Sequence, residues 1–279
     1  MIADWLAGLA GSVVIAGGAY AKRSLSLSGA IAAVAMGSLM YAAGSAPWFG
    51  TLIAFFVTSS ALSSWKRKRK EAAEQGYAKS GRRDAGQVWA NGGIGLLLCL
   101  GAAAFPHPYW WAAFVGVMAT VTADTWATEI GGLSAAAPRS IVNGRPVAPG
   151  TSGGVTPLGL AASAAGGLFI GAAAWGLSAV ADPLAGAAGA PNAATGPALL
   201  ALGLAGGMVG SLADSWVGAV LQVMYRCPVC GREIEKREHC GAQAARLRGL
   251  SWMTNDAVNA LSSLAGAAAA LGGALLFLY

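Results

Sequence analysis

The stretch Ala123-Asp124-Thr125-Trp126-Ala127-Thr128-Glu129-Ile130-Gly131-Gly132 ends a long apolar run, yet it carries two carboxylates and two hydroxyls. In a soluble protein such a segment could lie anywhere. In a bilayer, an ionisable side chain is costly and usually marks a functional site. Whether the chain lies in a membrane therefore decides both its fold and the meaning of this stretch.

The composition is that of a membrane protein. Hydrophobic residues make up 56% of the 279 residues and charged residues only 11%, whereas a soluble domain has about 25% charged residues. The runs with little charge are about 17–25 residues long, which is the length of a membrane-spanning helix. The 41 glycines allow helices to approach one another closely. We therefore predict an all-α, polytopic helix bundle that forms one integral membrane domain over residues 1–279.

Polar breaks divide this domain into eight expected transmembrane helices. Short breaks such as Lys22-Arg23 and Ala46-Pro47 separate some spans, and longer polar loops separate others. A polar insert at residues 222–254 precedes the last span. The expected spans are residues 3–20, 25–42, 47–65, 86–105, 109–133, 156–181, 196–221 and 256–278.

The basic residues indicate the orientation of the bundle. Neither terminus and none of the even-numbered joints between spans contains a basic residue. All 18 lie in the odd-numbered joints: Lys22, Arg23; Lys66, Arg67, Lys68, Arg69, Lys70, Lys79, Arg82, Arg83; Arg139, Arg145; Arg226, Arg232, Lys236, Arg237, Arg246, Arg248. Lys and Arg accumulate on the cytoplasmic side of membranes. We therefore expect both termini on the non-cytosolic side of the cell membrane and the 222–254 insert in the cytosol. The net charge of +6 then reports topology, and no nucleic-acid partner is expected. The alternative topology lays the first apolar segment along the membrane interface.

Carboxylates from three spans converge just below the cytosolic face in this topology. Each lies near the cytosolic end of its span: Asp124, Glu129, Asp214 and Asp256. Carboxylates at one level repel each other unless a cation lies among them, and oxygen-rich sites suit Mg²⁺, often together with substrate phosphates. We therefore expect these four residues to hold one or two Mg²⁺ ions. The alternative is that each carboxylate only caps a helix or bonds to a neighbour.

A glycine-rich loop at residues 150–156 leads into the sixth span on the same side. Its successive backbone N–H groups and the positive end of the following helix are suited to bind phosphate. It is not a Walker A sequence, because no Lys follows the glycines. The alternative is a plain turn between two helices, and the arginines nearby could serve only to anchor the cytosolic face. The expected phosphate-binding residues are Gly150, Thr151, Ser152, Gly153, Gly154, Thr156, Asn255, Asn259, Arg139 and Arg145.

The polar insert contains a cysteine and histidine pattern. Cys227-Pro228-Val229-Cys230-Gly231 is a zinc-knuckle sequence, and His239-Cys240 follows it. The three cysteines and the histidine form a plausible structural Zn²⁺ set. A second Cys-x-x-Cys is missing, and adjacent His239 and Cys240 are awkward as ligands of one ion. A zinc-free thiol cluster is therefore the alternative.

Four ordered blocks of the sequence resemble one integral membrane family, which contains plant phytyl-phosphate kinase and animal transmembrane protein nineteen. The blocks are Asp124 to Gly131, Gly150 to Thr156, Gly210 to Ser215 and Asn255 to Asn259. The resemblance implies transfer of a phosphoryl group from a nucleoside triphosphate, of which CTP is one candidate, to a membrane-embedded isoprenyl monophosphate of the phytyl or geranylgeranyl kind. Asp124, Asp214, Asp256 and Glu129 would then be the catalytic residues, with the active site facing the cytoplasm.

A transporter or flippase for a lipid phosphate or an ion is the alternative function. Intramembrane carboxylates and glycine-broken helices are also typical of transporters. Polar groups at one face, instead of the midplane, favour the enzyme. The sequence leaves the oligomeric state open, including a homo-oligomer.

Overall fold

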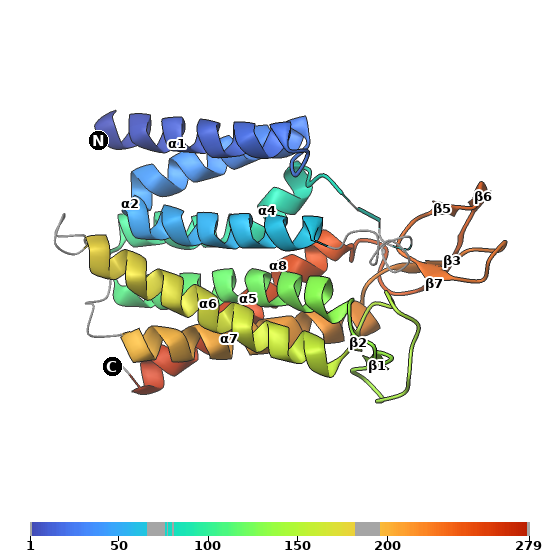
Figure 1. The fold of residues 1–279 in the computed structure, drawn as a ribbon. Coiled ribbons are helices and arrows are strands. Elements are labelled where there is room, and N and C mark those ends of the chain that lie inside the picture. The colour runs from blue at the N-terminus through green and yellow to red at the C-terminus, as the bar shows by residue number, and fades with distance from the viewer. Residues whose placement is uncertain (1, 66–75, 77, 80, 182–195, 278–279) are drawn as a thin grey trace.

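The computed structural model describes residues 2–65, 76, 78–79, 81–181 and 196–277. It is a bundle of long helices with small β-elements at one end (Figure 1), so the predicted all-α membrane bundle is confirmed. The helices are α1 (Ile2–Ala21), α2 (Leu27–Ser64), α4 (Ala85–Ala104), α5 (Pro108–Gly131), α6 (Pro157–Ala181), α7 (Gly196–Val220) and α8 (Asn255–Phe277). The strands are β1 (Arg139–Ser140), β2 (Gly154–Val155), β3 (Met224–Arg226), β4 (Glu233–Ile234), β5 (Glu238–His239), β6 (Ala242–Gln243) and β7 (Ala245–Arg248).

Helix α2 makes two passes through the bundle. Its regular geometry breaks at Ser45, where φ is 75° and ψ is −175°. Pro47 follows two residues later, and proline removes a backbone donor and clashes with the preceding turn. The first leg runs beside α1 and the second leg returns (Figure 1). The predicted spans 25–42 and 47–65 are therefore two helical segments that meet at the break at Ser45, and the described helices contain the eight expected passes.

Helix α5 is the central helix of the bundle. Every residue from Trp111 to Ala123 is buried, and α4, α6, α7 and α8 all pack against α5. Six of the helices that the structure describes are long and apolar enough to cross a membrane, and α5 is not one of them. Although α5 is less apolar than the other helices, it does not face the lipid, because the neighbouring helices cover it from several sides.

Close packing fixes α5 against α7 and α8. The Thr120 hydroxyl donates hydrogen bonds to the carbonyl oxygens of Gly116, at 2.8 Å, and Gly206, at 3.1 Å. A Cβ added at Gly210 would lie 2.0 Å from Thr120 Oγ1, and one added at Gly266 would lie 1.8 Å from it. Only glycine permits this approach, as expected for membrane helices that pack through small residues.

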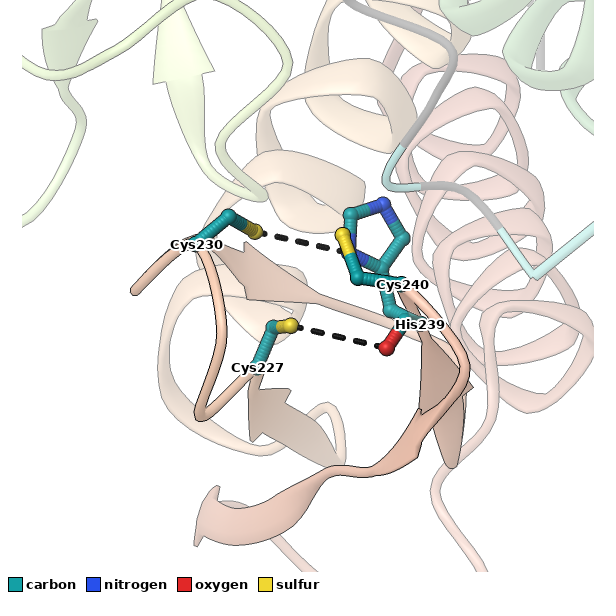
Figure 2. A group of neighbouring side chains, drawn as sticks. All are labelled: Cys227, Cys230, His239 and Cys240. Atoms are coloured by element: carbon teal, nitrogen blue, oxygen red, sulfur yellow. Dashed lines mark hydrogen bonds between the residues drawn. The ribbon is translucent and has the colours of Figure 1, made fainter.

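The two chain termini and the polar elements lie at opposite ends of the bundle. The N-terminus of α1 and the C-terminal end of α8 share one end, and all the strands lie at the other (Figure 1). The 222–254 insert there forms an antiparallel sheet in the order β4-β3-β7 and a β5-β6 pair. Its turns bring Cys227, Cys230, His239 and Cys240 together (Figure 2). The Lys66 to Lys70 run lies outside the described residues.

Candidate functional site

A polar cavity of about 1350 Å³ opens at the strand end of the bundle. Side chains of α2, α4, α5, α6, α7 and α8 line it, together with the loops beside them. Most of the residues that the sequence suggested meet here, because their helices all reach this end. The residues brought together are Asp124, Glu129, Asp214, Asp256, Gly150, Thr151, Ser152, Gly153, Gly154, Thr156, Asn255 and Asn259.

Asp124 and Asp214 face each other across α5 and α7. Their carboxyl groups are close enough to influence each other's charge. The hydroxyl of Ser262, on α8, donates a hydrogen bond to Asp214 Oδ2 at 3.0 Å. Two ionised carboxylates in contact repel unless a proton or a cation lies between them. The pair can therefore share a proton or hold a cation.

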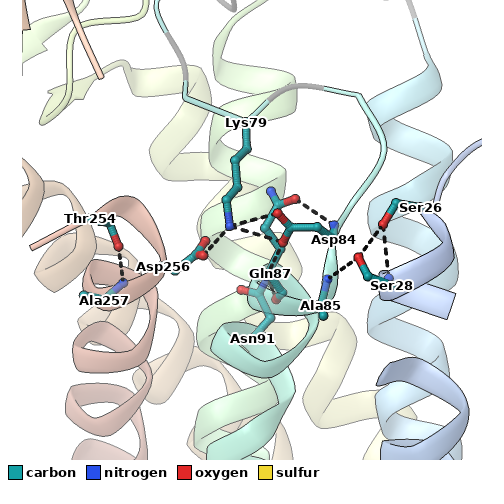
Figure 3. Close-up of polar contacts among 11 residues, drawn as sticks. Ser26, Ser28, Lys79, Asp84, Ala85, Gln87, Asn91, Thr254, Asp256 and Ala257 are labelled. Carbon is teal, nitrogen blue, oxygen red and sulfur yellow. Dashed lines mark hydrogen bonds and ion pairs between the residues drawn. The ribbon is translucent and has the colours of Figure 1, made fainter. Parts of the chain in front are cut away.

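Asp256, in the first turn of α8, is only half paired. Its Oδ2 accepts a hydrogen bond from the Lys79 ammonium at 2.5 Å (Figure 3). Its Oδ1 is buried and has no hydrogen-bond partner within the described part of the chain. A buried acceptor without a partner costs about 1–3 kcal/mol. A cation or a donor group of a ligand would remove that cost, so the residue fits a Mg²⁺ ligand.

Lys79 joins two carboxylates at the rim of the cavity. Its ammonium also lies 3.1 Å from both Oδ1 and Oδ2 of Asp84, the N-cap residue of α4 (Figure 3). Burial opposes the charge of the ammonium, but Asp256 and Asp84 outweigh burial and raise the pKa of Lys79. Burial likewise opposes the charge of Asp84, but the Gln87 N–H and Lys79 outweigh it and lower the pKa of Asp84. The sequence placed Lys79 only among the topology-setting charges.

Glu129 lies on the cavity wall and also braces α2. Its Oε1 accepts a hydrogen bond of 2.5 Å from the Ser63 hydroxyl, near the end of the second leg of α2. Glu129 follows Asp124 by five residues, which turns it about 140° around the helix. It therefore serves a different part of the cavity from the Asp124 and Asp214 pair.

Amide side chains connect α4 and α8 beside these carboxylates. The Asn259 amide donates a 3.4 Å hydrogen bond to Asn91 Oδ1, and the Asn91 amide donates one of 2.9 Å to the Gln87 carbonyl oxygen. Asn255 lines the cavity one turn before Asn259. Amides oriented in this way can hold phosphate oxygens as well as each other.

The glycine-rich loop rests on the last turns of α7. Gly153 has φ 82°, and an added Cβ would lie 2.4 Å from Ala219 Cβ. The backbone N–H groups of Thr151 and Gly154 donate to carbonyl oxygens nearby, whereas those of Ser152 and Gly153 have no acceptor among the residues that the structure describes. The N–H groups of Ser152 and Gly153 can therefore bind an anion.

The other polar groups of the loop have local partners. The Thr156 hydroxyl caps α6, because it accepts a 3.0 Å hydrogen bond from the Gly159 N–H. The Ser152 hydroxyl donates to Gln222 Oε1 at 2.9 Å. The loop is thus a helix cap and a linker to the insert as well as a source of N–H groups.

Arg139 and Arg145 do not line the cavity, although the sequence suggested that they bind phosphate. Strand β1 pairs with β2, and the exposed Arg139 side chain donates to the Gly144 carbonyl oxygen at 2.9 Å. Arg145 is exposed in the same hairpin. The arginines that do line the cavity include Arg82 and Arg83, which precede α4.

Glu235 is a cavity carboxylate that the sequence analysis missed. Its Oε1 accepts a 2.9 Å hydrogen bond from the Gln222 amide, and its Oε2 accepts one of 3.0 Å from the Ala78 N–H. Burial, the largest influence, raises the pKa of Glu235. Nothing in the sequence distinguishes Glu235 from the other charged residues of the insert, because only the folded insert carries it to the cavity.

The four cysteine and histidine residues of the insert form one compact cluster. Their potential ligand atoms all lie within 4.8 Å of one another. His239 Nδ1 lies 3.4 Å from Cys230 Sγ and 3.2 Å from Cys240 Sγ. Hydrogen bonds from the backbone, first that of Cys230, lower the pKa of the Cys227 thiol to about 6. The distances show that adjacent His239 and Cys240 point toward one centre, although the sequence made this geometry look unfavourable.

An apolar cavity adjoins the polar one. Side chains of α1, α2 and α4 line it, among them Met36, Phe55 and Phe56. Arg83, Gln87 and Asn91 line both cavities. A ligand with a charged head and an apolar tail could therefore contact both.

The fold and this site define a polytopic membrane protein with a polar cavity at one end of its helix bundle. The chain belongs to the integral membrane protein family DUF92, which it matches over residues 10–267. The family membership expected from the four sequence blocks is thus confirmed.

Relatives of the chain occur in plants, bacteria and archaea. It is 31% identical over 271 residues to Protein PGR of Arabidopsis thaliana, a match that covers 91% of this chain and 90% of the relative. It is 28% identical to an uncharacterized membrane protein of Synechocystis, over 81% of this chain and 74% of the relative. An uncharacterized membrane protein of Methanocaldococcus jannaschii is also 28% identical, over 72% of this chain and 76% of the relative. No solved structure matches the chain.

Proposed function

We propose that this protein is an isoprenyl-phosphate kinase of the cell membrane, with its active site facing the cytoplasm. It would transfer the γ-phosphoryl group of a nucleoside triphosphate, of which CTP is one candidate, to an isoprenyl monophosphate. The observation that carries the proposal is the shared cavity. Facing carboxylates, the unpartnered Oδ1 of Asp256 and two free N–H groups of a glycine-rich loop all line it.

The orientation rests on the distribution of charge. The described Lys and Arg residues lie in the joints at the strand end of the bundle, and such residues accumulate on the cytoplasmic side. The carboxylates lie close to that end. Asp124 is seven residues from the end of α5, Asp214 is six from the end of α7, and Asp256 is one from the start of α8. At about 1.5 Å per residue, all three lie within reach of a cytosolic nucleotide.

The apolar cavity favours a lipid-like acceptor. An isoprenyl phosphate would place its phosphate near Arg83, Gln87 and Asn91, which line both cavities. The apolar cavity is about 60 Å³, so it would hold only the first carbons of the chain, and the rest would lie in the bilayer. A small soluble acceptor would make no use of this apolar lining.

Asp124, Asp214 and Asp256 would hold one or two Mg²⁺. An ion held by these carboxylates would supply positive charge that offsets the charge of the phosphates. The N–H groups of Ser152 and Gly153 would bind phosphate oxygens of the nucleotide. Asn255 and Asn259 would orient the phosphates, and Glu129 would hold α2 in place at the cavity wall.

The transfer itself needs little from the protein beyond this positioning. An oxygen of the isoprenyl monophosphate forms a bond to the γ-phosphorus. The bond from that phosphorus to the oxygen bridging it to the β-phosphorus breaks, and the nucleoside diphosphate leaves with the bridging oxygen and the electron pair. The acceptor oxygen is already an anion, so no general base is required.

The test is product formation by the purified protein. Geranylgeranyl phosphate or phytyl phosphate is incubated with each of the four common nucleoside triphosphates and Mg²⁺ in nanodiscs, and the diphosphate is measured by mass spectrometry. Asp124→Asn should lower turnover by about 100-fold or more without unfolding the protein. Asp4→Asn is the matched control, because Asp4 lies in the first turn of α1 at the opposite end.

Transport is the competing function. If no combination of nucleotide and prenyl phosphate yields diphosphate, while the protein moves lipid phosphate between the leaflets of liposomes, the kinase proposal is wrong. Unchanged turnover in Asp124→Asn would remove Asp124 from the site.

A further inference from the structure

We infer that Cys227, Cys230, His239 and Cys240 bind one structural Zn²⁺ ion, which fixes the 222–254 insert and with it one wall of the polar cavity. This inference does not depend on the kinase proposal, because metal content and thiol protection test it directly.

The spacing of the four ligand atoms fits a tetrahedral ion. With Zn–S bonds of about 2.3 Å and Zn–N bonds of about 2.0–2.1 Å, tetrahedral ligand atoms lie about 3.6–3.8 Å apart. The sulfur to Nδ1 distances of 3.4 Å and 3.2 Å, from Cys230 and Cys240, are close to that value. All four ligand atoms lie within 4.8 Å of one another. Small side-chain rotations would therefore centre the set on one ion.

Hydrogen bonding alone explains this arrangement poorly. The Nδ1 atom of a neutral imidazole has either one proton or one lone pair. The thiols of Cys230 and Cys240 both approach the Nδ1 atom of His239, and a single lone pair accepts only one of them well. A Zn²⁺ ion at the centre would instead bind each sulfur as a thiolate and the nitrogen through its lone pair.

The backbone is shaped to aim these side chains inward. Gly231 follows the Cys-x-x-Cys turn with φ 70°, and its N–H donates to the Cys227 carbonyl oxygen at 2.9 Å. Cys240 itself has φ 52°, and Gly241 follows with φ 73°. A left-handed conformation is rare for a residue other than glycine, and strain of this kind persists where the surroundings determine it. If Cys240 and His239 bind the same ion, the ion would hold the backbone of Cys240 in this left-handed conformation.

Two hydrogen bonds of Glu235 connect the segment between the cluster residues to the cavity. Glu235 lies between the two halves of the cluster, five residues after Cys230 and four before His239. It is held by Gln222 and by the Ala78 N–H. The side chain next to it, Ile234, is only 1% exposed. An ion that fixes both ends of this segment would therefore also fix the position of Glu235 in the cavity wall.

The first experiment measures zinc in the full-length protein, purified in detergent without chelators. We expect about one Zn²⁺ per chain, and we expect Cys230→Ser and Cys240→Ser to lose it. Cys99→Ala is the matched control, because Cys99 is buried within α4 far from the insert in sequence. Glu235→Gln should keep its zinc, because Glu235 would be positioned by the ion without binding it.

The second experiment needs no variant and covers the case in which the cysteine variants fail to fold. Native wild-type protein is treated with a maleimide before and after a strong zinc chelator, and the modified thiols are mapped by mass spectrometry. The three thiols of the insert should react only after chelation. Trypsin should then cleave the insert at Arg232 or Lys236 faster than in the zinc-bound protein.

Two results would overturn the inference. One is a wild-type zinc content no higher than that of Cys230→Ser, with all three thiols reactive before chelation. The other is a disulfide among these cysteines in protein purified under reducing conditions. If variants that lose zinc keep the same trypsin cleavage rate at Arg232 and Lys236 as the wild type, the part of the inference that the ion fixes the insert is wrong.

Discussion

Replacing Gly153 with alanine tests how closely the glycine-rich loop rests on α7. The backbone φ of 82° costs a non-glycine residue about 1–2 kcal/mol. The added Cβ would also lie 2.4 Å from Ala219 Cβ and 2.8 Å from the Ser215 carbonyl oxygen, so the loop would have to move. Overpacking of this kind costs about 1–3 kcal/mol. We therefore expect Gly153→Ala to lower the free energy of unfolding by about 2–5 kcal/mol.

Gly144→Ala separates these two contributions. Gly144 also has a left-handed backbone, with φ 69°, but an added Cβ would meet no atom within 4 Å. Gly144→Ala should therefore lower the free energy of unfolding only by the cost of the left-handed backbone, about 1–2 kcal/mol. Both variants are compared by reversible unfolding in detergent and by their affinity for the nucleotide. Only Gly153→Ala should weaken nucleotide binding, because it displaces the free N–H groups of Ser152 and Gly153.

Equal destabilisation by the two alanines would refute this reasoning, because it would show that the loop does not press on α7. A second comparison uses Ala219→Gly, which removes the nearest contact of the added methyl group. The double variant Gly153→Ala/Ala219→Gly should recover part of the lost stability. No recovery would mean that the overlap with Ala219 is not the cause.

Two further predictions concern pH. Asp84 and Asp256 raise the pKa of Lys79 above its usual 10.5, so the stability from these ion pairs is fully present below about pH 10.5 and is lost as the pH rises through the raised pKa. Lys79→Met should therefore unfold at a lower temperature than the wild type at neutral pH. Its unfolding temperature should then fall less than that of the wild type as the pH is raised above about 10.5. If the two proteins lose the same amount of unfolding temperature over that pH range, the ion pairs of Lys79 do not cause the loss. Burial raises the pKa of Glu235 above 4.5, so stability falls as the pH rises from about 4.5 through the raised pKa. Glu235→Gln should remove that decrease in a pH series of thermal unfolding, and a decrease of the same size would show that other groups cause it.

The arrangement of the helices could be predicted from the sequence because composition and charge determine it locally. The absence of basic residues from every even-numbered joint placed both termini at one end, where the structure has them. Ala46-Pro47 predicted the break between the second and third spans, and the structure breaks beside it, at Ser45. A proline marks where a helix is broken or kinked, but tertiary packing decides which of the two occurs.

The parts of the candidate site on helices and in the glycine-rich loop could be predicted from the sequence, whereas contacts between distant segments could not. Depth along a helix follows from its rise per residue, so Asp124, Asp214 and Asp256 could be placed at one level. The prediction that Arg139 and Arg145 line the site is wrong, because both lie in a hairpin outside the cavity. Glu235 and Lys79 were missed because their contacts join segments far apart in the sequence, and no local pattern encodes such pairings. The longest of these contacts, between Lys79 and Asp256, spans 177 residues.

The position of the facing carboxylates follows from the packing one turn below them. Thr120 precedes Asp124 by four residues, and Gly210 precedes Asp214 by four. At that level the two helices approach so closely that a single Cβ would not fit, so α5 and α7 cannot easily separate. This packing sets the separation of α5 and α7 one turn before the two carboxylates. Such preorganisation lets a site meet a cation or a developing charge without rearrangement.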